Sequence, residues 1–453
     1  MNKKFNEFRE KYPNFIYKSY NIEIIEDNLK LTFNFEIPNL ASFNPTTIIP
    51  LNNHKIEINN TFFKYLVFNL GLVELISYYK CTCSPNIIIE ADYIDENQIN
   101  WFKKLYYYGW GEFLYLNNIE IDQEKLVNIK CTAIKKTIAS IDYNGQGNLI
   151  PIGGGKDSTV SLEILKKFKE DNHCFIINPK PVTLDCAKVA GYTQDKIISI
   201  KRNIDKKLIE LNNQGFLNGH TPFSAMVAFT SYITAFIYNK KYITLSNEAS
   251  ANESTVIGTK INHQYSKTYE FENDFNNYTK KYFGINISYF SLLRPLTEYQ
   301  IAMLFSNYKK YHQIFKSCNV GSKNEEWKWC CNCAKCLFVF TILSTYLYKD
   351  ELVNIFGEDM FDNKSLENIF KELLGYSETK PFECVGTYEE VRYATSLTIK
   401  KLEGQKLPYL LQFYKDNYPL ETNHNFENSY NNLHNLPKEY EELVRKELDK
   451  YAK

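Results

Sequence analysis

The ten residues LIPIGGGKDS, numbered 149–158, carry more structural information than any other part of the sequence. A short apolar run ends here in three consecutive glycines, which let the backbone turn sharply and approach a ligand closely. A helix is predicted to follow, and the unpaired N–H groups and the dipole of its first turn favour an anion. Lys156 can add a positive charge, and the Ser158 hydroxyl can donate to a phosphate oxygen. We therefore expect a phosphate-binding loop made of Gly153, Gly154, Gly155, Lys156, Asp157 and Ser158. The alternative is a plain strand–turn–helix connection capped by Asp157.

The segments around this loop predict a parallel sheet. Apolar strands are expected at 148–152, 174–177 and 242–245, with helices at 158–170 and 222–238. Strand, crossover helix and strand make the right-handed unit of parallel α/β sheets. Glu248 follows the strand at 242–245, at the carboxyl edge where such sheets receive nucleotides.

The whole chain is predicted to be α/β and to have three parts. An N-terminal α/β domain is expected over residues 1–135, where alternating apolar residues in 16–37 predict a hairpin. The core that carries the glycine loop and a cysteine cluster is expected over 136–348. Hydrophobic periodicity predicts a mostly helical region over 349–453.

Composition and charge exclude several classes of protein. The 453 residues include 53 Lys+Arg and 53 Asp+Glu, so the formal net charge is zero. This balance argues against nucleic-acid binding through a broad basic surface. The most apolar stretches, 224–238 and 336–348, are shorter than the roughly 20 residues that a membrane span needs. No apolar run follows the charges of the N-terminus, so no signal peptide is expected. We expect a cytoplasmic protein whose partners include neither nucleic acid nor membrane.

Five of the eleven cysteines fall between residues 318 and 336. Cys318, Cys330, Cys333 and Cys336 have the spacing C-x11-C-x2-C-x2-C, and four thiolates joined by such short loops suit a tetrahedral zinc ion. Cys331 is a fifth candidate that could replace Cys330. A redox pair, an iron–sulfur cluster and no metal are the alternatives. A zinc ion with four thiolate ligands would have no open position for catalysis.

The glycine loop resembles the SGGxDS signature of the PP-loop ATP pyrophosphatases. It departs from that signature at Gly153, which stands where serine is usual. The resemblance implies a parallel-sheet PP-loop core and a reaction that splits ATP into AMP and pyrophosphate, usually by adenylating a substrate oxygen. The loop is not a Walker A motif, because GxxxxGK[ST] is absent.

Six further blocks narrow the resemblance. They are NGHTPFS at 218–224, SNEASANE at 246–253, NHQYSKTYEFE at 262–272, RPLTE at 294–298, WCCNCAKC at 329–336 and PFECVGT at 381–387. Together with GGGKDS, and in this order, they resemble the UDP-N-acetylmuramoyl-L-alanyl-L-glutamate epimerase (MurL) family. The resemblance implies an isomerase that uses ATP and magnesium to invert the terminal L-glutamate of a UDP-muramoyl dipeptide, a small-molecule substrate, for peptidoglycan synthesis.

Candidate roles can be placed on individual residues. We expect the glycine loop to hold the pyrophosphate end of ATP and Asp157 to bind magnesium. The acid and base are expected among Cys384, His220 and Glu248. Substrate groups are expected to contact His263, Lys267, Arg294 and Asn252. Structural alternatives are a buried thiol for Cys384, a capping carboxylate for Glu248 and a charged surface for the cations.

Other functions fit the same motifs. A different PP-loop reaction, such as amide formation, thiolation or nitrile formation, would also use the glycine loop. The same epimerisation could act on a different peptide. A PP-loop-like fold can also serve as a nucleotide sensor without turnover.

Overall fold

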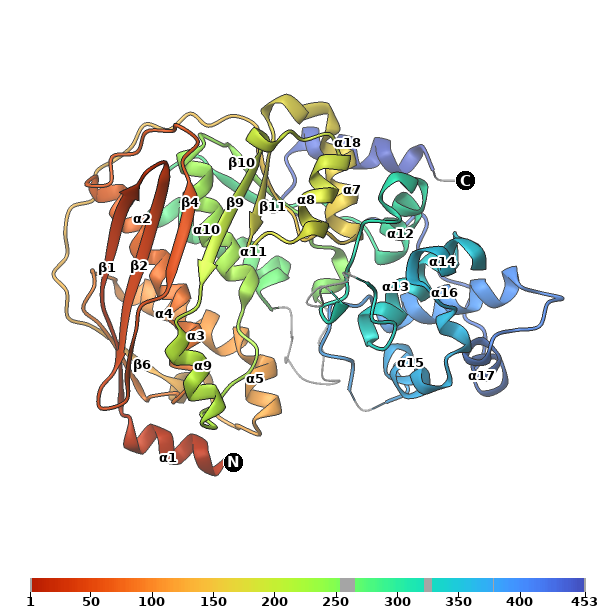
Figure 1. Ribbon diagram of the computed structural model, residues 1–453, viewed down its shortest axis with the longest axis horizontal. Coiled ribbons are helices and arrows are strands. Elements are labelled where there is room, and N and C mark those ends of the chain that lie inside the picture. The colour runs from red at the N-terminus through yellow and green to blue at the C-terminus, as the bar shows by residue number, and fades with distance from the viewer. Residues whose placement is uncertain (1, 253–264, 322–327, 378, 452–453) are drawn as a thin grey trace. The chain divides into compact units, whose positions relative to one another are not determined.

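The computed structural model describes residues 2–252, 265–321, 328–377 and 379–451, and its fold is mixed α/β, as predicted (Figure 1). The chain divides into two compact units, each assembled from several stretches of sequence. The first unit comprises 1–149, 198–243 and 261–289, and the second comprises 150–197, 244–260 and 290–453. The domain boundaries expected at 135 and 348 stay predictions.

The sheet of the first unit is built on the predicted hairpin. Strands β1 (Asn14–Ile25) and β2 (Asn28–Ile37) pair antiparallel, with Ile25 opposite Asn28 at the turn. Side chains of β2 alternate between partly exposed and buried along its whole length, because one face of the sheet covers the core. The hairpin expected over 16–37 is therefore confirmed.

Further strands extend this sheet on both sides of the hairpin (Figure 1). On one side β4 (Thr46–Pro50) pairs antiparallel with β2 and then with β9 (Ile197–Asn203), while the short β3 (Ala41–Phe43) also pairs with β2. On the other side β5 (Asn86–Ile89) runs parallel to β1, and β6 (Asn128–Cys131) runs parallel to β5. The sheet therefore has a parallel edge, which is the arrangement that creates ligand sites at strand ends.

Helices cover this sheet and complete the core of the first unit. Helix α2 (Thr61–Glu74) is buried on nearly every side and packs against α10 (Phe223–Ile237), where the rings of Phe62 and Phe236 lie 5.4 Å apart. The carboxylate of Glu74 is buried and accepts two hydrogen bonds from the Arg202 guanidinium, at 2.8 and 2.5 Å. The remaining α-helices of the first unit are α1 (Lys3–Lys11), α3 (Ile76–Tyr79), α4 (Glu96–Gly109), α5 (Gly111–Leu116), α6 (Gln123–Leu126), α9 (Lys206–Asn213) and α11 (Tyr269–Tyr282).

The second unit contains the carboxyl ends of a second group of strands. These are β7 (Asn148–Pro151), β8 (His173–Ile177), β10 (Tyr242–Leu245) and β11 (Ser288–Ser291), in the order β11-β10-β7-β8. Strands β7 and β10 are parallel, as expected, with Tyr242 opposite Asn148. Each of β7, β10 and β11 begins in residues of the first unit and ends in residues of the second.

Helices make up most of the second unit. Their bounds are α7 (Lys156–Ile164), α8 (Pro181–Val189), α12 (Glu298–Asn307), α13 (Ala334–Ser344), α14 (Lys349–Phe356), α15 (Glu367–Leu374), α16 (Tyr388–Lys401), α17 (Tyr409–Asn417) and α18 (Lys438–Asp449). The predicted helix over 158–170 begins two residues earlier and changes to a 3-10 helix over Leu165–Asp171. Figure 1 shows α13, α14, α15, α16 and α17 gathered into one helical group. The region after 348 is mostly helical, as predicted.

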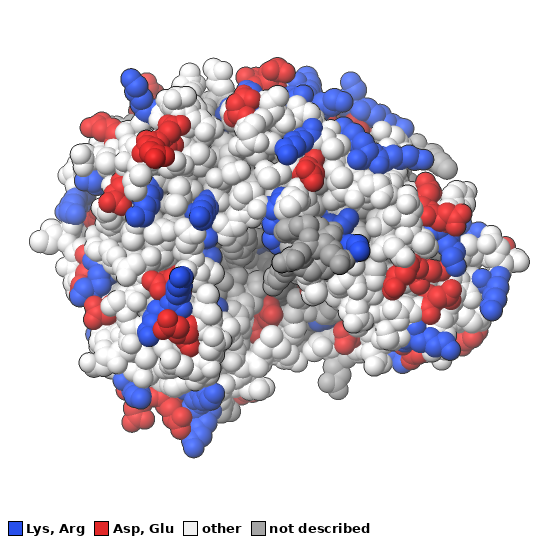
Figure 2. All heavy atoms as spheres, viewed as in Figure 1, with Lys and Arg blue, Asp and Glu red and all other residues white. Residues whose placement is uncertain are grey.

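Short 3-10 helices connect several of these elements. They lie at Gln194–Lys196, Ala249–Asn252, Tyr265–Lys267, Lys309–Tyr311, Met360–Asp362 and Lys364–Leu366. Within the described ranges, no helix has both the length and the apolar character that a membrane crossing requires. The face shown in Figure 2 carries lysines and arginines interspersed with acidic residues, in keeping with the net charge of zero.

Candidate active site

The glycine loop joins β7 to α7, as predicted, and its three glycines differ in what they allow. Gly154 has a φ of +80°, a backbone conformation that residues with a side chain rarely adopt. A Cβ there would lie 3.1 Å from Val182. A Cβ on Gly155 would lie 2.7 Å from the Ser317 hydroxyl oxygen. Gly153 has open space where a Cβ would point. The position where the PP-loop signature usually has serine can therefore hold one.

Hydrogen bonds from three parts of the second unit fix the loop. The Gly154 amide donates to the Ser158 hydroxyl oxygen at 3.2 Å, and that hydroxyl donates to the Gly155 carbonyl at 3.0 Å. The Lys316 amide donates to the Gly154 carbonyl at 2.9 Å, and the Cys186 thiol lies 3.7 Å from the same oxygen. Helix α7 starts at Lys156 with no side-chain cap among the described residues. Its first N–H groups are thus suited to an anionic ligand.

Ser317 and Lys316 are loop neighbours that sequence reasoning missed. The Ser317 hydroxyl oxygen is buried and makes no hydrogen bond to any described residue. An unpaired buried hydroxyl is costly, so a ligand group at this point would satisfy it. Burial lowers the pKa of the neighbouring Lys316. Both residues immediately precede Cys318, and that position is the only sequence signal that could have singled them out.

Lys156 does not extend into solvent. Its ammonium is 0% exposed and forms ion pairs with the carboxylates of Asp157 and Glu298. Burial alone would lower the pKa of Lys156, but these two carboxylates outweigh it and raise the pKa above its ordinary value. Burial raises the pKa of Glu298, and the nearby charges of Asp157 and Glu248 add to the rise, while Lys156 opposes it. Glu298 ends the RPLTE block, but its spacing gives no sign that it pairs with Lys156.

Glu390 fixes the backbone of Glu298 by a hydrogen bond. Its carboxylate accepts the backbone N–H of Glu298 at 2.7 Å, at the start of α12, and the N–H of Thr387 at 2.8 Å, at the start of α16. Burial raises the pKa of Glu390. One carboxylate therefore caps the starts of two helices whose first residues are 90 positions apart in sequence. This fixes the position of Glu298.

The residues predicted after β10 lie in the same unit as the loop. Glu248 is buried and accepts a hydrogen bond from the Ser250 hydroxyl at 3.3 Å. The fully buried Arg294 donates to the Glu248 carbonyl at 2.9 Å and to the Ser291 hydroxyl at 3.3 Å. Arg294 thus holds the segment that carries Glu248. Asn252 ends the 3-10 helix Ala249–Asn252.

Cys384 lies in the segment between α15 and α16 and is partly exposed. The ammonium of the buried Lys335 donates to the Cys384 carbonyl oxygen. Lys335 lies 5.2 Å and Lys156 lies 5.9 Å from the centre of the Phe338 ring. The Phe338 ring therefore contacts both the ammonium that pairs with Glu298 and the ammonium that bonds the Cys384 carbonyl. Lys335 was not predicted as a site residue, although it stands between two cysteines of the cluster.

The four predicted cysteines come together. Their sulfur atoms all lie within 4.8 Å of one another, with separations of 3.3 Å (Cys318–Cys330) and 3.5 Å (Cys333–Cys336). Four sulfurs at about 2.3 Å from a central ion would be about 3.8 Å apart. Cys331 turns away, and its thiol donates to the Phe356 carbonyl at 3.3 Å. The set that contains Cys330 is therefore confirmed as a cluster that could hold a metal ion.

The other predicted residues belong to the first unit or lie outside the described residues. His220 precedes α10, and its Nδ1 atom lies 3.4 Å from a Glu112 carboxylate oxygen. Lys267 ends the 3-10 helix Tyr265–Lys267. His263 lies outside the described residues. The roles expected for these three residues stay predictions.

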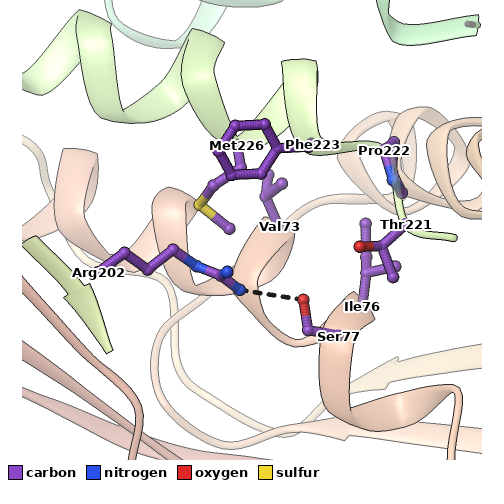
Figure 3. A pocket seen from close by; sticks show the side chains of 8 residues that line it. All are labelled: Val73, Ile76, Ser77, Arg202, Thr221, Pro222, Phe223 and Met226. Carbon is purple, nitrogen blue, oxygen red and sulfur yellow. Dashed lines mark hydrogen bonds between the residues drawn. The ribbon is translucent and has the colours of Figure 1, made fainter. Parts of the chain in front are cut away.

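A small cavity near His220 is lined by residues of the first unit, including Ser77, Arg202, Pro222 and Met226 (Figure 3). Arg202 points across it and donates to the Ser77 hydroxyl at 3.1 Å (Figure 3). The cavity has a volume of about 20 Å³, which is enough for one water molecule. It is too small for a substrate.

The loop geometry predicts opposite outcomes for two neighbouring glycines. Gly154→Ala should lower the free energy of unfolding by about 1–2 kcal/mol, because alanine would be forced into the left-handed region beside Val182. Gly153→Ser should leave it unchanged within about 0.5 kcal/mol, because space is open there. Thermal and urea unfolding of both variants would measure this. Equal destabilisation by the two substitutions would contradict the loop conformation.

Two family models match this chain. Residues 6–292 match the MurL N-terminal domain, and residues 314–427 match the MurL C-terminal domain. No solved structure shows a significant match.

Curated relatives agree with these models. A protein of Xanthomonas oryzae pv. oryzae named UDP-N-acetyl-alpha-D-muramoyl-L-alanyl-L-glutamate epimerase is 33% identical, over 77% of this chain and 78% of the relative. Proteins of the same name from Micromonospora sp. and Salinispora tropica are each 32% identical, over 75% and 72% of this chain and 76% and 72% of their own lengths. Since one family model alone spans residues 6–292 and these relatives are 32–33% identical over 72–77% of this chain, the chain belongs to the MurL family.

Proposed function

We propose that this protein is an ATP- and magnesium-dependent epimerase. It would adenylate the terminal carboxylate of UDP-MurNAc-L-Ala-L-Glu, invert the α-carbon of the glutamate and release AMP and pyrophosphate. The observation that carries this proposal is the identity of 32–33% to proteins named as this epimerase, over about three quarters of each chain. The glycine loop of the second unit supports the use of ATP.

The chemistry explains why an epimerase would need ATP. The α-proton beside a carboxylate is very weakly acidic, because its removal adds negative charge to a group that is already an anion. Adenylation removes that charge and makes an acyl phosphate, so the enolate becomes accessible. Protonation from the other face then inverts the centre, and hydrolysis releases AMP. The protein has to supply a phosphate cradle, a base, an acid and donors to the enolate oxygen.

The phosphate cradle is proposed at the start of α7. The residues fit a phosphate group, since the helix lacks a side-chain cap among the described residues, space is open at Gly153 and the buried Ser317 hydroxyl has no described partner. Gly153–Ser158 would hold the pyrophosphate end of ATP. Asp157 would bind magnesium, which neutralises phosphate charge when it is bound. Glu298 keeps the Lys156 ammonium beside Asp157.

Proton transfer is proposed for groups on the polar segments. Cys384 and Glu248 lie in the second unit with the loop, and His220 lies in the first. Lys335 fixes the backbone that carries Cys384, and Arg294 fixes the backbone that carries Glu248. The backbone that carries each of these two candidates is thus held by a buried cation, which supports a role in an active site, where reacting groups have to be positioned precisely.

The four clustered cysteines are proposed to hold a structural zinc ion. Four thiolates complete its tetrahedral shell, so the ion would order the chain rather than bind substrate. Cys333 is the residue before α13, and Cys336 lies in its first turn. Zinc would therefore fix the start of the helix that presents Lys335 and Phe338.

The proposed reaction can be tested in deuterated water with ATP, magnesium and UDP-MurNAc-L-Ala-L-Glu. Mass spectrometry would follow deuterium at the α-carbon, chiral analysis would follow the released glutamate, and chromatography would follow AMP. The expected result is deuterated D-glutamate together with AMP, both dependent on ATP. AMP without deuterium would contradict epimerisation, and deuterium without AMP would contradict adenylation.

Ser317→Ala tests the phosphate cradle. Removing a buried hydroxyl that has no described partner should leave the free energy of unfolding unchanged or slightly higher. If the hydroxyl donates to a phosphate, the KM for ATP should rise about tenfold, which is the effect of about 1.4 kcal/mol. Steady-state kinetics and thermal unfolding would measure both. An unchanged KM would remove Ser317 from the cradle.

The zinc proposal has a matched pair of variants. Cys330→Ser should reduce the zinc content from one ion per chain to near zero, because it removes a cluster sulfur. Cys331→Ser should retain one ion, since its thiol bonds a backbone carbonyl instead. Elemental analysis of both purified proteins would check this. Full zinc content in Cys330→Ser, or iron in the unsubstituted protein, would contradict it.

A further inference from the structure

One cavity of the first unit has no role in the proposed reaction. Its volume is about 240 Å³, equal to the share of about eight water molecules in the liquid. It lies beyond the carboxyl ends of β5 and β6, which run parallel to each other and to β1, with Ile89 opposite both Tyr17 and Cys131. The cavity lining includes Asp92 after β5, Lys135 after β6 and Tyr20 further along β1. Ligands in open α/β sheets bind at this kind of edge.

Positive charge is in excess around the cavity. Four lysines line it (Lys64, Lys135, Lys136 and Lys281), against the two carboxylates of Asp92 and Asp95. The Asp95 carboxylate already caps α4, since it accepts a hydrogen bond from the backbone N–H of Gln98 at 2.9 Å. Lys64 lies in the first turn of α2, a helix of 14 residues whose dipole also favours an anion. The lining therefore suits a ligand that carries phosphate.

Tyrosines supply flat surfaces and hydroxyl groups next to these charges. The Tyr20 hydroxyl lies 3.4 Å from an Asp92 carboxylate oxygen, and the Tyr282 hydroxyl donates to Asp95 at 2.9 Å. The Tyr65 hydroxyl oxygen accepts a hydrogen bond from the side-chain amide of Gln98 at 2.8 Å. Carboxylates placed after a strand bind ribose hydroxyls in nucleotide sites, and aromatic rings stack on bases. The cavity thus combines groups for phosphate, for sugar and for a base.

We propose that this cavity binds a nucleoside phosphate. The lysines would contact its phosphate groups, Asp92 would accept from its ribose hydroxyls, and the tyrosine rings would pack against its base. This site stands on the first unit alone and does not rest on the proposed reaction. Its ligand could be a free nucleotide or the nucleotide end of a larger substrate, since both present the same chemistry.

The test is calorimetric titration of the full chain with UDP, without ATP or magnesium. The double variant Lys64→Ala/Lys136→Ala should raise the Kd for UDP about tenfold or more, because each lysine offers a charge-assisted bond to phosphate. Lys18→Ala/Lys30→Ala is the matched control, since it removes two lysines of the same unit that do not line the cavity, and it should leave the Kd unchanged. Lys64→Arg/Lys136→Arg, which keeps the charges, should retain most of the affinity.

Competition then identifies the source of the nucleotide. If UDP-MurNAc-L-Ala-L-Glu displaces UDP, the cavity takes the nucleotide end of that substrate. If AMP displaces UDP and the muramoyl dipeptide does not, the cavity takes free nucleotides. Either result supports the site. Undetectable UDP binding at millimolar concentration, or equal loss of affinity in the cavity variant and its matched control, would overturn the proposal. The deuterium experiment is a separate measurement, so its failure would leave this one interpretable.

Discussion

The buried ammonium of Lys156 sets the arrangement of the second unit. A charge removed from water costs several kcal/mol unless opposite charges and hydrogen bonds surround it. Asp157 supplies one carboxylate from the next residue, but the other comes from Glu298, at the start of α12. Glu390, at the start of α16, then caps the backbone of Glu298. One charge therefore ties the glycine loop to two distant helices.

The cysteine cluster extends this network through α13. Cys333 and Cys336 bracket the start of the helix, so the cluster fixes where Lys335 and Phe338 point. Lys335 donates to the Cys384 carbonyl, and the Phe338 ring lies near the ammonium groups of both Lys335 and Lys156. The cysteine cluster and the Lys156–Glu298 ion pair share no residue. Both nevertheless help to position the segments around the glycine loop and Cys384. A metal ion in the cluster would thus influence catalysis without touching substrate.

The two units share one structural feature, which is a candidate binding site at the carboxyl ends of parallel strands. Polar residues follow the ends of parallel strands in each: the glycine loop follows β7 in the second unit, and Asp92 follows β5 in the first. The loop offers helix N–H groups and a buried hydroxyl, whereas the cavity offers lysines, tyrosines and carboxylates. The loop is suited to phosphate alone, and the cavity to a whole nucleotide.

The sequence by itself determined the features that depend on neighbours along the chain. The turn at GGGKDS, the hairpin around residues 26–27 and the cysteine spacing all follow from local geometry, and each is present in the structure. The partners of these features were decided by tertiary structure. Glu298 lies 142 residues from Lys156, and Cys384 lies 49 residues from Lys335. Periodicity and spacing describe contacts within a few residues, whereas pairing across such separations depends on which helices pack together. The motif shows where the positive charge of Lys156 stands along the chain, but its burial and its pairing with Glu298 are known only when the chain has folded.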